Sequence, residues 1–126
     1  MNKFWALFLL LSAASLTLSC GTASPSRQLQ SITISQNANG GQIEFVATGT
    51  FSAPPVTVSP LPVFWSYAPP PGQYDLTAQP FTFQCDFVGV YSSPLIAWAP
   101  PDPSAASSGS LSPTAMINAS AQITCP

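Results

Sequence analysis

The sequence is set apart first by the charge that it lacks. Only six of its 126 residues are charged, which is 5%, whereas soluble domains usually carry about 25%. The basic side chains are Lys3 and Arg27 alone, so the chain cannot neutralise a row of phosphates, and nucleic acid is excluded as a partner. The same shortage excludes a coiled coil with charged flanks and a basic helix lying on a membrane surface.

Histidine is absent altogether, and no lysine follows Lys3. A histidine-centred metal site is therefore excluded, and the commonest general base of enzymes is missing. The 15 prolines, spread from Pro25 to Pro126, argue against long helices because each removes a backbone donor. With 46% hydrophobic residues and few charges, hydroxyl and amide groups must solvate the surface.

The N-terminal segment has the layout of a secretory signal. Lys3 precedes an uncharged stretch, Phe4 to Ser19, whose most apolar part is Phe4 to Leu11. A transmembrane helix is the alternative, but this stretch contains four serines and threonines and is shorter than the roughly 20 apolar residues that a span needs. We therefore expect the chain to be exported.

The end of that segment, Leu16 to Gly21, resembles the lipobox of bacterial lipoproteins, with the small residue Ser19 directly before Cys20. The resemblance implies that residues 1–19 are removed and that acylated Cys20 anchors the protein in the lipid bilayer. In that family an aspartate after the cysteine tends to retain the protein at the inner membrane. Gly21 therefore favours the outer membrane or the cell surface. Plain secretion without lipid is the alternative.

The remaining chain divides into a tether and one domain. Residues 20–28 are small, polar and interrupted by proline, which predicts a flexible tether, and residues 29–126 have the length of one ordinary domain. Apart from Cys20, the chain has two cysteines, Cys85 and Cys125. An even number in an exported chain predicts one disulfide, with two buried free thiols as the alternative.

Alternation of apolar and polar residues predicts an all-β fold. Ala115 to Cys125 alternates as one strand, and Phe81, Phe83, Cys85 and Phe87 form a second apolar face, so both cysteines are expected to point inward. Other strands are expected within Ser31–Ser35, Gln42–Phe51, Val56–Val58, Val63–Tyr67, Val88–Tyr91 (continuing the strand at Phe81) and Leu95–Ala99, with turns at 37–41 and 69–72 and a long loop at 100–113. About seven short strands without a helix predict a β-sandwich, and an up-and-down barrel is the alternative.

Three of these segments carry a family resemblance. Leu29–Ser35, Gln42–Phe51 and Val63–Ser66 look like the opening strands of bacterial Ig-like (group 2) domains, over about the first half of the domain. The resemblance implies an Ig-like Greek-key β-sandwich, as used in bacterial surface and adhesion proteins, with Trp65 as its core tryptophan. Both Cys85 and Cys125 follow Trp65, so an antibody-type disulfide is not implied.

Residues that could carry catalysis are scarce. The acids are Glu44, Asp75, Asp86 and Asp102, and no motif around them suggests a catalytic carboxylate pair. A calcium site at Asp75 or Asp102 is an alternative, although these acids are not clustered as in known calcium loops. We therefore expect no catalytic residue, metal or cofactor, and a structural, adhesion or protein-interaction module.

The aromatic residues support a second hypothesis, a carbohydrate-binding module. Trp65, Tyr67, Tyr74, Tyr91 and Trp98 could form a stacking platform for sugar rings, although aromatics more often fill the core of a small domain. Tyr67 and Tyr74 flank the proline-rich turn and are expected to be the exposed pair. A platform requires two or three of these rings coplanar and exposed on one face, whereas a non-catalytic module buries Trp65 and scatters the others.

Overall fold

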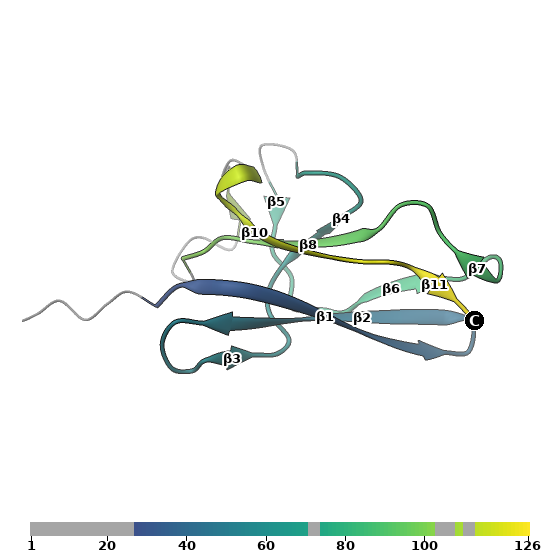
Figure 1. Cartoon of the computed structure of the whole chain (residues 1–126), viewed down its shortest axis with the longest axis horizontal. Coiled ribbons are helices and arrows are strands. Elements are labelled where there is room, and N and C mark those ends of the chain that lie inside the picture. Colours follow the sequence, from purple (N-terminus) through teal and green to yellow (C-terminus); the bar gives the residue numbers. More distant parts are fainter. Residues whose placement is uncertain (1–26, 71–73, 103–107, 110–112) are drawn as a thin grey trace, which may run out of the picture.

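The computed structural model describes residues 27–70, 74–102, 108–109 and 113–126. These residues form eleven short strands and one 3-10 turn (Figure 1). The elements are β1 (Leu29–Asn39), β2 (Gln42–Phe51), β3 (Thr57–Val58), β4 (Phe64–Ser66), β5 (Tyr74–Asp75), β6 (Phe81–Gln84), β7 (Gly89–Val90), β8 (Leu95–Ala99), β9 (Ser108–Gly109), η1 (Pro113–Ala115), β10 (Ile117–Ala121) and β11 (Thr124–Cys125).

The strands form two main antiparallel sheets that face each other. In the first, β2 pairs with β1 on one side and with both β6 and β3 on the other. In the second, the order is β10-β8-β4. Two short pairs, β11-β7 and β5-β9, complete the fold. Figure 1 shows β1, β2, β3 and β6 in one layer and β4, β8 and β10 in the other, so the predicted all-β, sandwich-like architecture is confirmed.

The core between the sheets consists of two inner clusters. The first inner cluster comprises Leu29, Ile32, Ala47, Phe51, Leu61, Val63, Ala97 and Ala99. The second inner cluster comprises Ile43, Phe45, Leu95, Ala121, Ile123 and Cys125. Every second residue of β2 from Ile43 and of β8 from Leu95 is buried, and all of these except Gly49 belong to the two clusters, as expected for strands with one face turned inward.

A third cluster lies on the other face of the β10-β8-β4 sheet. In this outer cluster Tyr74, Trp98 and Met116 are buried, and Phe64, Leu76 and Ile96 pack against them. Figure 1 shows β5 and η1 on the side of the second sheet that faces away from β1 and β2. The second sheet is therefore covered on both faces.

The hairpin between β1 and β2 turns at residues 40–41, within the predicted turn at 37–41, whose first three residues belong to β1 instead. Asn39 pairs with Gln42 across Gly40 and Gly41, whose φ angles are 59° and 83°. Two successive positive φ values belong to the turn type that matches the twist of paired strands, and glycine adopts them without steric cost. Strands were also confirmed at Gln42–Phe51 and Leu95–Ala99, and β3 lies at the edge of its sheet as expected.

The prediction of one strand over 115–125 is wrong. The segment consists of the end of η1, then β10 and β11, which pair with β8 and β7 respectively. Ala115 is exposed and Met116 is buried, the reverse of the predicted faces. The reason is that the 3-10 turn η1 interrupts the alternation of inward and outward residues before β10. In addition, the outer cluster covers Met116, which was expected on the solvent-exposed face.

The predicted continuation of the Phe81 strand to Tyr91 is also wrong. β6 ends at Gln84, the Cys85 N–H donates to the Gly41 carbonyl, and the chain then leaves the first sheet. Gly89 has a φ of 134°, and β7 pairs with β11 instead of with β2. Phe87, expected to face inward, is therefore exposed.

The described part begins inside the predicted tether. Arg27 Nη2 donates to the Pro55 carbonyl at 2.6 Å, and Gln28 exchanges hydrogen bonds with Ser52. The last two residues assigned to the tether therefore contact the domain. The signal segment 1–19, Cys20 and the remaining tether to residue 26 lie outside the described residues, as do residues 71–73 of the predicted proline-rich turn.

The predicted loop at 100–113 contains a strand. β9 lies within it and pairs with β5, so this segment is not wholly irregular. Residues 103–107 and 110–112 lie outside the described part. Among the described residues, no helix is both long enough and apolar enough to cross a membrane.

Candidate functional site

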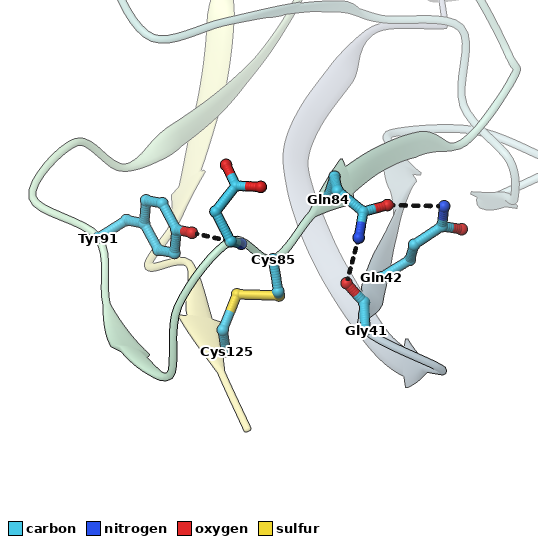
Figure 2. Close-up of a disulfide and its surroundings, with 7 residues drawn as sticks. Gly41, Gln42, Gln84, Cys85, Tyr91 and Cys125 are labelled. Atoms are coloured by element: carbon cyan, nitrogen blue, oxygen red, sulfur yellow. Dashed lines mark hydrogen bonds between the residues drawn. A yellow bond between two sulfur atoms is a disulfide. The ribbon is translucent and has the colours of Figure 1, made fainter.

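Cys85 and Cys125 form the predicted disulfide, with their Cα atoms 5.8 Å apart (Figure 2). The bond joins the end of β6, in the first sheet, to β11, which follows the last strand of the second sheet. Its two cysteines lie on apolar faces of their segments, as expected: Cys125 is part of the second inner cluster and Cys85 packs against it. Figure 2 shows Tyr91 on one side of the bond and the side-chain pair of Gln42 and Gln84 on the other.

The segment that follows Cys85 is fixed by hydrogen bonds to Tyr91. The Asp86 N–H donates to the Tyr91 hydroxyl at 3.0 Å, and the Tyr91 N–H donates to the Ile123 carbonyl at 2.9 Å. The Gln122 side-chain amide donates to the Tyr91 carbonyl. Because the N–H, carbonyl and hydroxyl of Tyr91 all have partners, its ring has a defined position.

Two phenylalanine rings pack directly on Tyr91. Phe87 stacks on it with ring centres 4.2 Å apart and an interplanar angle of 21°. Phe83 meets it edge to face, with centres 4.7 Å apart. Offset stacking and edge-to-face contacts are the favoured geometries of aromatic pairs. The three rings therefore form a rigid aromatic cluster beside the disulfide.

A groove of about 430 Å³ opens next to this cluster. Its lining includes the rings of Tyr67, Phe83 and Tyr91 and the acidic residue Asp86. Ser92, Ser93 and Ile123 complete the lining. The volume falls in the range of pockets that accept a small molecule or a single large side chain, roughly 300 to 1,000 Å³.

An exposed apolar tip adjoins the groove. Phe87 is 54% exposed, Val88 78% and Val90 60%, and all three follow Asp86 in the chain. Apolar side chains are usually buried, so several neighbouring exposed ones indicate a contact surface. We call Phe87, Val88 and Val90 the apolar tip.

Tyr67 lies at the edge of the groove and is 47% exposed. Its ring meets Phe81 edge to face, with centres 6.3 Å apart. Partial burial removes water from the hydroxyl and raises the pKa of Tyr67 above its ordinary value of 10.0. The ring is thus partly shielded on the protein side and open on the groove side.

The predicted exposure of Tyr74 is wrong. Tyr74 is only 5% exposed, because β5 and η1 cover the outer face of the second sheet and place it in the outer cluster with Trp98. The Trp98 indole N–H donates to the Ser66 hydroxyl at 3.0 Å. Of the five aromatics considered for a sugar platform, only Tyr67 and Tyr91 line the groove.

Trp65 lies against both inner clusters, and it is partly buried. Its indole nitrogen is buried without a hydrogen-bond partner among the described residues. Trp98 is the more completely buried tryptophan of the two.

A second, smaller cavity of about 200 Å³ lies elsewhere, and its lining includes Arg27 and four residues of the first inner cluster, Leu29, Phe51, Leu61 and Ala99. The Arg27 guanidinium carbon stands 3.7 Å above the centre of the Phe51 ring. Its nitrogen atoms donate to the carbonyls of Ala53 and Pro55. Arg27 therefore fixes the beginning of the domain to the segment after β2.

Within residues 27–70, 74–102, 108–109 and 113–126, no group of three or more potential metal ligands is present. No protein-family model, curated protein or solved structure matches the chain.

The groove and the apolar tip were not among the features predicted from the sequence. The groove draws on three segments far apart in the chain, around Tyr67, 83–93 and Ile123. One signal could have indicated the tip: Phe87-Val88-Gly89-Val90 is an apolar run with a glycine, directly after a disulfide cysteine.

Proposed function

We propose that this protein is an exported, lipid-anchored lipoprotein whose Ig-like domain binds a protein partner at the cell envelope and catalyses no reaction. Cys20 is the lipid attachment site in this proposal, and the groove with the apolar tip is the binding surface. The proposed location is the outer membrane or the cell surface.

Export is supported by the disulfide between Cys85 and Cys125. Disulfides persist in oxidising compartments outside the cytosol and are rare inside it. The signal-like segment before Cys20 gives the same location from an independent part of the sequence.

The Ig-like assignment is supported by strand order. The sheet β1-β2-β6 and the sheet β10-β8-β4 follow the order A-B-E and G-F-C of immunoglobulin-like sandwiches, if the strands are taken in chain order. The disulfide differs from the antibody pattern, since it joins the end of β6 to β11 instead of two central strands.

The observation that carries the binding function is the position of the apolar tip. Figure 1 shows the beginning of the described chain at one end of the long axis, and β7 and the C-terminus at the other. β1 alone, with 11 residues at about 3.3 Å each, spans roughly 35 Å along this axis. A domain held through its N-terminus can therefore present the apolar tip away from its anchor.

A protein partner fits the exposed surface better than a sugar platform. Phe87 stacks on Tyr91 instead of leaving that face open, and Tyr74 is buried, so the rings do not form one flat exposed row. Exposed valines offer no flat ring on which a sugar could stack. Neighbouring exposed apolar side chains instead suit contact with an apolar surface of another protein.

Intact mass spectrometry of the protein extracted from membranes tests the anchor. We expect a chain that begins at Cys20 with added acyl chains. On reduction its mass should rise by that of two hydrogen atoms, because it contains the single disulfide between Cys85 and Cys125. In cells, Cys20→Ala should release the protein from the membrane fraction, whereas Ser19→Ala is the matched control that keeps a small residue before the cysteine. An unmodified wild-type chain cleaved elsewhere would contradict the proposal.

Binding is tested by the same protein on whole cells. Val88→Asp and Val90→Asp place charges in the apolar tip, and both should abolish crosslinking of the anchored protein to its partner without releasing it from the membrane. Val56→Asp is the control, because Val56 is also an exposed valine but lies between β2 and β3. Equal crosslinking by all three variants would contradict a binding role for the tip.

A further inference from the structure

The groove contains one acidic residue and no basic one. Asp86 lines it together with Tyr67, Phe83 and Tyr91. Lys3 and Arg27 are the only basic residues of the sequence. Arg27 is engaged elsewhere, with the Ala53 and Pro55 carbonyls and the Phe51 ring. The described part of the chain therefore supplies no cation to the groove.

Aromatic rings and a carboxylate together form a favourable environment for a cation. The face of a tyrosine or phenylalanine ring attracts a cation within about 6 Å of its centre. An arginine guanidinium is planar, so it can stack on a ring and pair with a carboxylate at the same time. Within the groove, the rings of Tyr91 and Phe83 are held in place by the contacts of Tyr91, and the Tyr67 ring meets Phe81 edge to face; such fixed rings lose less entropy on binding.

We propose that the groove receives an arginine side chain of the protein partner, with the guanidinium between Tyr67 and Asp86 and with neighbouring apolar residues of the partner on the apolar tip. This inference rests on the proposed function, because it names the chemistry of the partner at the same surface. It commits to a protein with an exposed arginine flanked by apolar residues.

Two other occupants fit less well. An anionic membrane surface would be repelled by Asp86 and by the formal net charge of −2. A neutral sugar could stack on Tyr67, but it would make no use of the charge of Asp86. Both are outcomes that the experiment below distinguishes.

The experiment is a titration of the full-length ¹⁵N-labelled protein in nonionic detergent micelles, followed by amide NMR shifts. The probe is the peptide acetyl-Val-Arg-Val-amide, and its control is the same peptide with citrulline, which keeps the shape of arginine without its charge. We expect saturable shifts at residues 86–93 and 123–125 with the arginine peptide and none at Arg27. The citrulline peptide should bind at least about threefold more weakly.

Two variants and a matched control locate the cation. Asp86→Asn should weaken the arginine peptide about 1.5- to fivefold, the range expected for an exposed ion pair. Tyr67→Ala should weaken it about two- to fivefold. Asp75→Asn, which removes an exposed carboxylate on β5, should leave binding unchanged.

Several results would overturn the inference. These are equal affinity for the arginine and citrulline peptides, unchanged binding by Asp86→Asn, absence of saturable shifts, and saturable shifts at the same residues with maltotriose or with vesicles of anionic phospholipid. A lysine peptide that binds as tightly as the arginine peptide would overturn the assignment to a guanidinium. Lipid attachment at Cys20 is measured separately, so it can fail while this titration succeeds, and the reverse.

Discussion

Removal of the disulfide by the double substitution Cys85→Ala/Cys125→Ala should lower the free energy of unfolding by about 4 kcal/mol. The two cysteines are 40 residues apart, and closing a loop of that length in the unfolded chain corresponds to about 4 kcal/mol in the chain-entropy model. Typical domains are stable by about 5 to 15 kcal/mol, so this loss is a large share of the total. The enclosed segment contains all of β8 and β10, which form most of the second sheet.

The measurement is urea unfolding at 25 °C, followed by the fluorescence of Trp65 and Trp98. Wild-type protein in reductant is the control, and it should unfold at nearly the same urea concentration as the double variant. Hydrogen exchange at the Tyr91 amide, which is bonded to the Ile123 carbonyl, should become faster in both. A loss below about 1 kcal/mol would refute the loop-closure reasoning and would mean that residues 85–125 are already restricted in the unfolded chain.

Three further changes test other parts of the fold. Gly49→Ala should lower the free energy of unfolding by about 1 to 2 kcal/mol, because a Cβ there would lie 2.9 Å from methyl groups of Leu29 and Leu61. These methyl groups would have to move toward the adjacent cavity. An unchanged midpoint in urea unfolding would contradict this. Arg27→Ala should lower the free energy of unfolding by about 1 to 2 kcal/mol in the same assay. Arg27→Lys should restore only part of this stability, since lysine lacks the planar guanidinium with its several donors. Full recovery of stability by Arg27→Lys would show that the charge alone matters. Burial raises the pKa of Tyr67, so the contribution of the neutral Tyr67 to stability is present below pH 10.0 and is lost as the pH rises through the raised value. Between about pH 10 and 12 the wild type should therefore lose more stability than Tyr67→Phe. Parallel plots of unfolding free energy against pH for the two proteins would contradict this.

The sequence predicts those elements whose signals are local. The glycine pair at 40–41 requires positive φ angles wherever the hairpin lies, and the alternation along Gln42–Phe51 depends only on neighbouring residues. The disulfide could be predicted because Cys85 and Cys125 both fall on apolar faces of their segments.

The elements that could not be predicted depend on distant partners. Phe87 is exposed because β7 pairs with β11, which lies more than thirty positions further along the chain. Tyr74 is buried because β5 pairs with β9, again about thirty residues away. Neither pairing leaves a local pattern, since each involves only two residues per strand.

The placement of the two ends has a mechanical consequence. A force applied between the proposed membrane anchor before β1 and the proposed partner at the apolar tip would run along β1 and not across it. The hydrogen bonds between β1 and β2 would then be loaded in shear, so many of them would have to break together. Pulling from the tip would also meet the covalent link between Cys85 and Cys125, which keeps β7 and β11 from peeling away from the rest of the domain.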